Sequence, residues 1–453
     1  MARQLARWAV GVRLDDVPPD VRHVARRSIL DTVGVTLVGR SHGTLARLRS
    51  VAARLYPMPA GDRMRGRVSA AGAALVNATA AHVYDFDDTS YTGVMHGSAP
   101  VLPAALAVAQ DRDIDGRRLL EAFVAGVEVT YAVALAAQAR LYSKGWWSTG
   151  TFAVLGATVA AGKLLDVDAE RMTAAIGLAA AQANGAKSIF GTDGKAYLCG
   201  RTAQAGVEIA HAAAGGLTGP ADAFESARGF FALLNDGMCD PGAVDALGTV
   251  WRQVDPGIMF KSYPICSAAH AAAELAPRLL VRARRTAVQV AQVIVDVPPL
   301  VALSLVHADP RTAQEAQFSA PFAVACALMH GSIGPEHLAA PVIADPALRA
   351  LMAKVEMRVD QALAAGDLAR RCPEGSRVTL RFADGGEASA YLGSFAGMPD
   401  NPLDDQAIEA KFRHCVCLSE AGADASRANR LSDALWRIES ERPREILPEL
   451  MTA

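Results

Sequence analysis

Several features that mark common protein classes are scarce in this sequence of 453 residues. Aromatic residues make up only 6% of the chain, although 51% of it is hydrophobic, and alanine and glycine are abundant. Small side chains let helix axes approach closely, so this composition favours packed helices. The formal net charge is −2 and the pI is near 6.6. These values favour neither a nucleic-acid partner nor a membrane surface.

Cysteine and long apolar runs are also limited. The seven cysteines are an odd number and include no C-x-x-C pair, which argues against a disulfide framework or a zinc ribbon. Cys415 and Cys417 stand beside His414 but lack a second pair, so we expect no metal site there. No stretch of about 18 apolar residues is free of charge, and the N-terminus lacks the apolar core of a signal peptide. We therefore expect a cytoplasmic protein without a membrane-spanning helix.

The order of sequence patterns suggests two domains, as the length of the chain also does. Up to about residue 255 the chain alternates apolar helices with short turns. The clearest helical segments are 21–39, 117–139, 149–165, 168–184 and 201–214. Strand patterns then appear at 286–298, 354–360 and 377–393, with a hairpin turn at Asp384-Gly385-Gly386. Helical segments lie between them, including 315–330 and 346–353.

These patterns predict a mostly α protein. A large all-α helical domain is expected at residues 1–265, completed by residues 396–453, because the tail at 401–449 is amphipathic and helical. A smaller α+β domain is expected at residues 266–395.

The stretch from His82 to Leu106 places charged groups inside otherwise apolar, alanine-rich sequence. These groups are Asp85, Asp87, Asp88 and His96. Charges this dense are rarely tolerated between buried helices unless each has a partner. The stretch is therefore predicted to form the wall of a pocket. The alternative is a solvated loop in which Asp88 or Thr89 caps the next helix.

Two further breaks in the apolar pattern carry lysines. Lys195 stands just before the predicted helix 201–214, where its ammonium could face an anion at the helix N-terminus. Lys261, Cys266 and His270 lie within ten residues at the expected domain junction, a common place for small ligands. The alternatives are an exposed loop lysine at 195 and a purely structural His–Lys pair. Cys266 as a thiol nucleophile lacks the sequence motif of a cysteine hydrolase.

A fourth break, at residues 142–150, contains two of the five tryptophans. It is either a buried aromatic plug or a segment in which Trp147 shapes one wall of the pocket.

Five motifs in this order make the chain resemble a known family. They are DFDDT followed by His96-Gly97-Ser98, GWWSTGTFAVLGA, GTDGKAYLCGRTAQAG, KSYPICSAAHAA and QFSAPFAVA. The chain resembles the MmgE/PrpD family, which includes 2-methylcitrate dehydratase, cis-aconitate decarboxylase and iminodisuccinate epimerase. The resemblance implies a large helical domain, a smaller α+β lid domain, a homodimer, and catalysis without a metal or organic cofactor.

The resemblance also implies a set of site residues. The catalytic candidates are Asp85, His96, Lys195 and Lys261, which match site positions of the family, and His270, which is added as a possible second acid or base or an orienting group. The substrate-binding candidates are Thr89, Trp147, Cys266 and Phe322. Three of these depart from the family pattern. Trp147 and Cys266 stand where members have histidine, and Phe322 stands where the decarboxylase has tyrosine.

The reactions of the family share one step, the loss or gain of a proton at a carbon next to a carboxylate. Lys195 and Lys261 would stabilise the resulting dianion, and His96 is the best acid or base because histidine ordinarily titrates near neutral pH. We therefore expect a cofactor-independent lyase, most simply a hydro-lyase, acting on a small di- or tricarboxylate. A dicarboxylate epimerase, a cis-aconitate-type decarboxylase and a catalytically silent carboxylate-binding homodimer remain alternatives.

Overall fold

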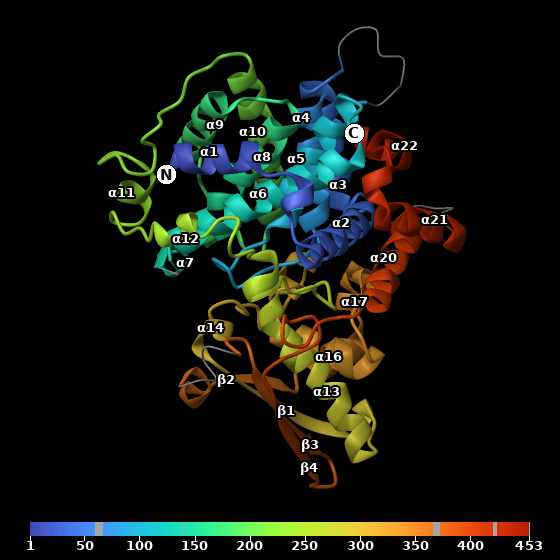
Figure 1. Cartoon of the computed structure of the whole chain (residues 1–453). Helices are drawn as coiled ribbons and strands as arrows, with labels where there is room; N and C mark the ends of the chain where they lie inside the picture. The colour runs from blue at the N-terminus through green and yellow to red at the C-terminus, as the bar shows by residue number, and fades with distance from the viewer. Residues whose placement is uncertain (59–66, 139, 366–371, 420–423, 453) are drawn as a thin grey trace.

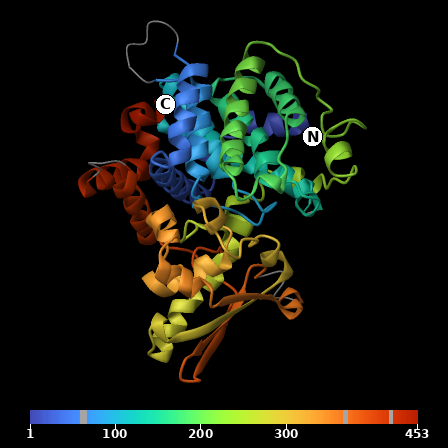
Figure 2. The same ribbon diagram turned by 180° about the vertical axis from the view of Figure 1, so that it is seen from behind.

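The computed structural model describes residues 1–58, 67–138, 140–365, 372–419 and 424–452. The protein is mostly α, as predicted, and the described residues form one four-stranded sheet. Figure 1 shows the helices α1 to α12 gathered in one part of the molecule and the sheet with its own helices in the other. The view from behind shows the same separation, with both chain termini on the helical part (Figure 2).

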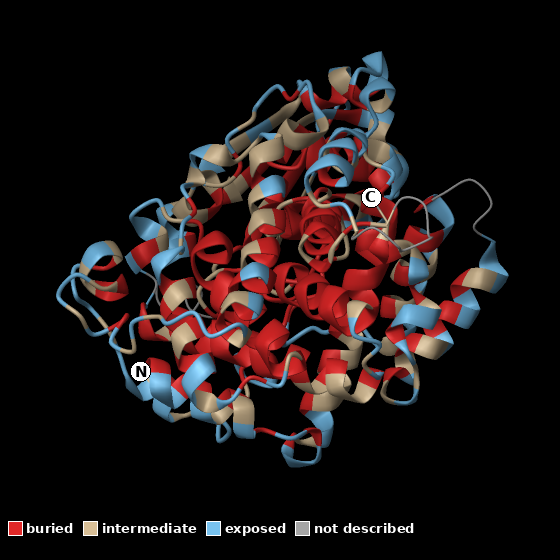
Figure 3. Cartoon of the chain, turned by 90° about the horizontal axis from the view of Figure 1, so that it is seen from above, coloured by how far each residue is buried: buried red, intermediate tan, exposed pale blue. Residues whose placement is uncertain are grey.

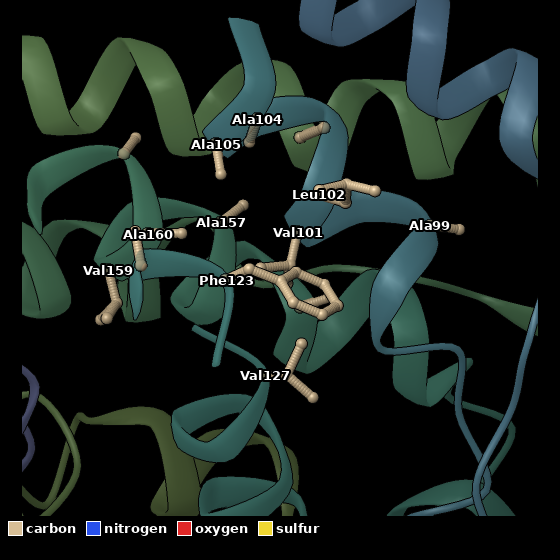
Figure 4. Close-up of a cluster of buried hydrophobic side chains, with 14 of the residues drawn as sticks. Ala99, Val101, Leu102, Ala104, Ala105, Phe123, Val127, Ala157, Val159 and Ala160 are labelled. Atoms are coloured by element: carbon tan, nitrogen blue, oxygen red, sulfur yellow. The ribbon is translucent and has the colours of Figure 1, made fainter. Parts of the chain in front are cut away.

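Helices, all long except the four-residue α7, build the first part of the chain. They are α1 (Ala2–Gly11), α2 (Pro19–Gly39), α3 (Gly43–Leu55), α4 (Ala70–His82), α5 (Ser98–Asp111), α6 (Gly116–Ala136), α7 (Arg140–Ser143), α8 (Ser148–Leu164), α9 (Ala169–Ala181) and α10 (Asp193–Ala214). The helices predicted at 117–139, 149–165 and 168–184 correspond to α6, α8 and α9. Helices α5, α6 and α8 meet in a core of alanine, valine and phenylalanine side chains, of which Figure 4 shows Val101, Phe123, Val127, Ala157 and Ala160.

Two sequence-based expectations for this part need correction. Helix α10 begins at Asp193, with the Thr192 side chain accepting from the Gly194 N–H, so Lys195 lies in its first turn. After α10, residues 215–257 are largely irregular and hold only the short helices α11 (Phe230–Leu234) and α12 (Gly242–Asp245) and a single π-turn. Glycine, proline and aspartate are frequent in this segment and favour turns over helix, which explains the difference.

The sheet has the strand order β2-β1-β3-β4. Its strands are β1 (Val290–Val297), β2 (Val355–Val359), β3 (Ser376–Phe382) and β4 (Glu387–Leu392). Strand β2 runs parallel to β1, whereas β3 is antiparallel to β1 and to β4. The predicted hairpin turn joins β3 to β4, with Gly385 in the left-handed region at φ 86°.

Further helices accompany the sheet. They are α13 (His270–Ala283), α14 (Pro299–Ala302), α15 (Ala313–Ala316), α16 (Ala320–His330), α17 (Ala340–Ile343) and α18 (Pro346–Met352). Helices α13 and α16 pack against each other, and both contact strands of the sheet. The helix predicted at 315–330 is broken between α15 and α16, where Ser319 caps α16 by accepting from the Phe322 N–H.

The C-terminal tail returns to the helical part, as the amphipathic pattern suggested. It forms α20 (Asp405–Ser419), α21 (Ala425–Trp436) and α22 (Pro443–Ile446). Helix α20 packs along α2. Buried residues therefore form one core that joins residues 2–260 to residues 408–451, and a second core within residues 265–382. Figure 3 shows the buried residues concentrated at the centre of the helices, with exposed residues around the rim.

Small residues set the spacing of the helices that matter most for the site. A Cβ on Gly200 of α10 would come within 2.1 Å of Thr79 Oγ1 and 2.4 Å of the Leu75 carbonyl oxygen, both on α4. Only glycine permits so close an approach. Helices α4 and α10 run antiparallel, so the end of α4 meets the start of α10.

Helix α6 (Gly116–Ala136) is long and apolar enough to cross a membrane by length and composition, but 89% of its most apolar window is buried inside the structure. This is the burial pattern of a core helix.

Candidate active site

The loop between α4 and α5 carries its three carboxylates into the interior. Asp85, Asp87 and Asp88 are each at most 2% exposed. The alternative of a solvated loop is therefore wrong. Neither Asp88 nor Thr89 caps the next helix, because α5 begins at Ser98 after Gly97. Each buried carboxylate needs partners within the protein.

Asp85 forms ion pairs with both lysines. Lys195 Nζ lies 2.5 Å from its Oδ1, and Lys261 Nζ lies 2.9 Å from its Oδ2. Burial opposes ionisation of Asp85, but the two ammonium groups hold the pKa of this carboxyl well below its usual range. Asp85 also adopts a left-handed backbone conformation, φ 50°, which is uncommon for a residue with a Cβ and is typical of functional sites.

Lys261 reaches the site from the segment that links the two cores. Two residues before it, Met259 forms a reciprocal pair of backbone hydrogen bonds with Thr89, which fixes this segment against the loop. The Lys261 ammonium also donates to the Asp85 carbonyl oxygen at 2.7 Å. Burial would lower the pKa of Lys261, but the adjacent Asp85 carboxylate raises it above the ordinary value. Both partners of this buried pair are therefore charged.

Two histidines share the second carboxylate. Nδ1 of His82 lies 3.0 Å from Asp87, and Nδ1 of His96 lies 2.9 Å from Asp87 Oδ2 and 2.9 Å from the Asp88 carbonyl oxygen, its hydrogen-bond partner. The Nε2 atoms of these rings point to the first carboxylate, at 4.0 Å and 3.8 Å from Asp85 Oδ1. Burial opposes ionisation of Asp87, but the two imidazoles hold its pKa well below the usual range.

The aromatic wall of the site includes Trp147, which is 2% exposed. Its ring stacks on His82 with centroids 5.4 Å apart, and the Lys195 ammonium lies 5.7 Å from its centroid. Trp147 therefore is buried and also borders the charged cluster. Residues 142–150 therefore fit both interpretations, a buried aromatic plug and a segment in which Trp147 shapes a wall of the pocket. Thr89 lies beside the cluster, where its hydroxyl donates to the Met95 carbonyl oxygen at 3.0 Å.

The remaining candidates lie farther from the charged centre. His270 packs between Tyr263 and Phe395, and burial together with the nearby Lys261 charge lowers its pKa to about 3. Burial, reinforced by Asp85, raises the pKa of the Cys266 thiol to about 12, which disfavours a thiolate nucleophile. Phe322 is fully buried in the core beside the sheet. No hydrogen bond or ion pair within the described ranges joins any of these three side chains to Asp85.

Sequence reasoning assigned no catalytic or binding role to three members of this neighbourhood. His82 and Asp87 stood in the charged stretch, and the spacing of three residues between His82 and Asp85 was the available signal. Glu374 gave no signal in the sequence, because only the fold brings it to Tyr91 and Ser267, whose hydroxyls donate to it at 2.9 and 3.0 Å. Burial raises the pKa of Glu374 above its ordinary value.

Comparison with known proteins agrees with the motifs. The model of the MmgE/PrpD N-terminal domain matches residues 3–239, and that of the MmgE/PrpD C-terminal domain matches residues 263–437. The chain belongs to the MmgE/PrpD family.

Curated proteins similar to this MmgE/PrpD chain are named cis-aconitate decarboxylase. The human protein is 25% identical over 418 residues, which cover 89% of this chain and 85% of the relative. The Aspergillus terreus protein is 24% identical over 462 residues, covering 95% and 91%. The similarity therefore extends through both parts of the fold.

One group in this MmgE/PrpD site has the donor atoms of a metal site. It consists of His82, Asp85, Asp87 and His96, whose ligand atoms all lie within 4.8 Å of one another. Two lysine ammonium groups already neutralise Asp85, and a divalent cation placed here would be repelled by both. The donor set therefore fits an anion held by the lysines better than a metal ion, and the expectation of metal-free catalysis stays a prediction.

Proposed function

We propose that this protein is a cofactor-independent lyase that acts on a small di- or tricarboxylate, most simply a hydro-lyase. The observation that carries the proposal is the meeting of Lys195, Lys261 and the His96 imidazole at one buried carboxylate, Asp85. Two ammonium groups beside a proton-transfer group are what an enzyme needs to remove a proton next to a carboxylate.

The two lysines would bind one carboxylate of the substrate. Their ammonium groups would then contact both that carboxylate and Asp85. When a proton leaves the adjacent carbon, that carboxylate gains negative charge, and the lysines stabilise the charge without further movement. Each charge-assisted hydrogen bond contributes about 1.5–3 kcal/mol. Because both lysines are nearly excluded from water, little solvent screens this interaction.

Dehydration then needs one base and one acid. The base takes the proton from the carbon next to the carboxylate, and the electron pair of the C–H bond forms the new double bond. The C–O bond on the neighbouring carbon breaks, and the departing hydroxyl takes a proton from the acid and leaves as water. His96 has the position for the acid, since its Nδ1 is held by the Asp88 carbonyl oxygen and the Asp87 carboxylate and its Nε2 faces the lysine pair.

Carbon–carbon cleavage is the second candidate, because the relatives that span most of the chain are named cis-aconitate decarboxylase. Three positions weigh against it. Trp147, Cys266 and Phe322 stand where the family resemblance implies histidine, histidine and tyrosine. A site that lacks these groups has fewer means of supplying the proton that must replace the lost carboxylate.

Incubation with a panel of polycarboxylates, including citrate, 2-methylcitrate, cis-aconitate and iminodisuccinate, separates the possibilities. Loss of water with a new ultraviolet absorbance is the result that we expect. Release of carbon dioxide would establish the decarboxylase. Deuterium uptake from solvent without loss of water would establish an epimerase, and a raised melting temperature without any reaction would leave a binding protein. The family resemblance also implies a homodimer, which sedimentation equilibrium would test.

A further inference from the structure

His82 is the last residue of α4, and its side chain is completely buried at the centre of the site. The edge of its ring meets the His96 ring with centroids 4.5 Å apart and planes inclined at 76°. Trp147 covers its other side. The side chain also borders the cavity that Lys195, Gln317 and Phe318 line. His82 therefore stands between the aromatic wall and the lysine pair.

The hydrogen-bonding capacity of His82 is only half used. Its Nδ1 faces both oxygens of Asp87 at 3.0 Å. An ionised carboxylate only accepts, so Nδ1 carries the hydrogen. Its Nε2 is buried and has no hydrogen-bond partner among the residues that the structure describes. A buried polar atom without a partner is unusual and calls for an explanation. Here that atom lies 4.0 Å from the carboxylate oxygen that Lys195 binds.

We propose that His82 is a second proton-transfer residue of this site, paired with His96 through Asp87. The inference rests on the proposed function. Asp87 holds the His82 ring by Nδ1, and Asp87 together with the Asp88 carbonyl oxygen holds the His96 ring by Nδ1. Both Nε2 atoms are thereby directed to the position where the substrate carboxylate would bind. Trp147 stands in place of a histidine that the family resemblance implies. The Nε2 of His82, the ring on which Trp147 stacks, is available to transfer a proton instead.

The environment assigns His82 the role of base. Burial lowers its pKa to about 4, although Asp87 opposes this, so the ring is neutral at pH 7. In the reaction, its Nε2 takes the proton from the carbon next to the lysine-bound carboxylate, and the dianion that forms favours the charged ring. His96 Nε2 gives a proton to the departing hydroxyl. The two rings thus end with exchanged protonation states and return to the start by proton exchange with solvent.

The variant His82→Asn tests this role. An asparagine amide can donate to Asp87 from near the position of Nδ1, but it has no atom at the place of Nε2. On the panel compound that the wild-type enzyme converts, we expect kcat and the rate of hydrogen exchange at the substrate carbon to fall by about 10²–10⁴-fold, with KM nearly unchanged. His211→Asn, on the exposed face of α10, is the control and should keep wild-type rates. A decrease of less than tenfold in His82→Asn would overturn the proposal.

A second measurement uses the wild-type protein and requires neither turnover nor a folded variant. Nitrogen NMR of histidine-labelled protein should show His82 protonated on Nδ1 only at pH 7.5. Tricarballylate, a tricarboxylate without a hydroxyl group, should shift the His82 Nε2 signal and leave His211 unchanged. A proton found on the Nε2 of His82 would overturn the proposal. So would an unchanged Nε2 signal while tricarballylate shifts His96. Failure of the wild-type enzyme to convert any panel compound would instead count against the proposed function.

Discussion

Replacing Lys261 by methionine should be costly, because it breaks a buried ion pair without removing the anion. Methionine keeps an unbranched apolar stem of similar length and removes the ammonium group with its charge and its hydrogen-bond donors. Asp85 would lose the donors at 2.9 Å to Oδ2 and 2.7 Å to its carbonyl oxygen. Removing one partner of a buried pair destabilises a protein by about 3–5 kcal/mol. Lys195 still holds Oδ1 at 2.5 Å, so we expect the lower end, about 3 kcal/mol.

Urea unfolding of the variants Lys261→Met, Asp85→Asn and the double variant measures this coupling. The double variant should lose less stability than the sum of the two single losses, by about 1 kcal/mol or more, because the residues are in contact. The control is Lys144→Met, whose ion pair with Asp236 lies at the surface and should contribute little to stability because solvent screens it. Strictly additive losses for Lys261 and Asp85 would refute the buried pair.

The same pair predicts how the effect depends on pH. The pKa of Asp85 is held below 3.8, so its contribution to stability is present above that pH and is lost as the pH falls through the lowered value. The pKa of Lys261 is raised above 10.5, so its contribution is present below that pH and is lost as the pH rises through the raised value. The difference between wild type and Lys261→Met should therefore be constant from about pH 5 to 9.

Three further predictions concern catalysis. His96→Ala should lower kcat by about 10²–10⁴-fold if His96 moves a proton in the rate-limiting step. A raised KM with wild-type kcat would show that it only binds substrate. Activity should survive exhaustive chelation with EDTA, because Lys195 and Lys261 oppose a cation at the one candidate metal group in the described ranges. Loss of turnover that one divalent ion restores would contradict this. Trp147→His should add activity on cis-aconitate-type substrates, measured as release of carbon dioxide, since it restores a residue type that the family resemblance implies. No gain in a folded variant would show that Trp147 does not account for the difference.

Local patterns in the sequence determined much of the fold. The alternation of branched apolar and polar residues predicted β1, and the turn at Asp384-Gly385-Gly386 predicted the β3–β4 hairpin. Both predictions were possible because period-2 patterns and turn residues act within a few positions. The apolar helices α6, α8 and α9 could also be predicted, because the 3.6-residue period of their apolar residues is likewise a local pattern. The irregular segment at 215–257 was wrongly predicted to be helical, because its apolar residues were given more weight than its frequent glycine, proline and aspartate, which favour turns.

The same distinction between local pattern and tertiary contact applies to the residues of the site. The charged stretch around Asp85 could be recognised from the sequence, because several carboxylates in apolar surroundings require partners wherever they fold. The partners themselves were decided by the tertiary structure. Lys195 and Lys261 lie 110 and 176 positions from Asp85, and only the antiparallel packing of α4 on α10 and the Thr89–Met259 bridge bring their ammonium groups to its two oxygens. The link from Asp87 to both His82 and His96 was equally invisible in the sequence, because hydrogen bonds depend on distance and direction in space and leave no periodic pattern along the chain.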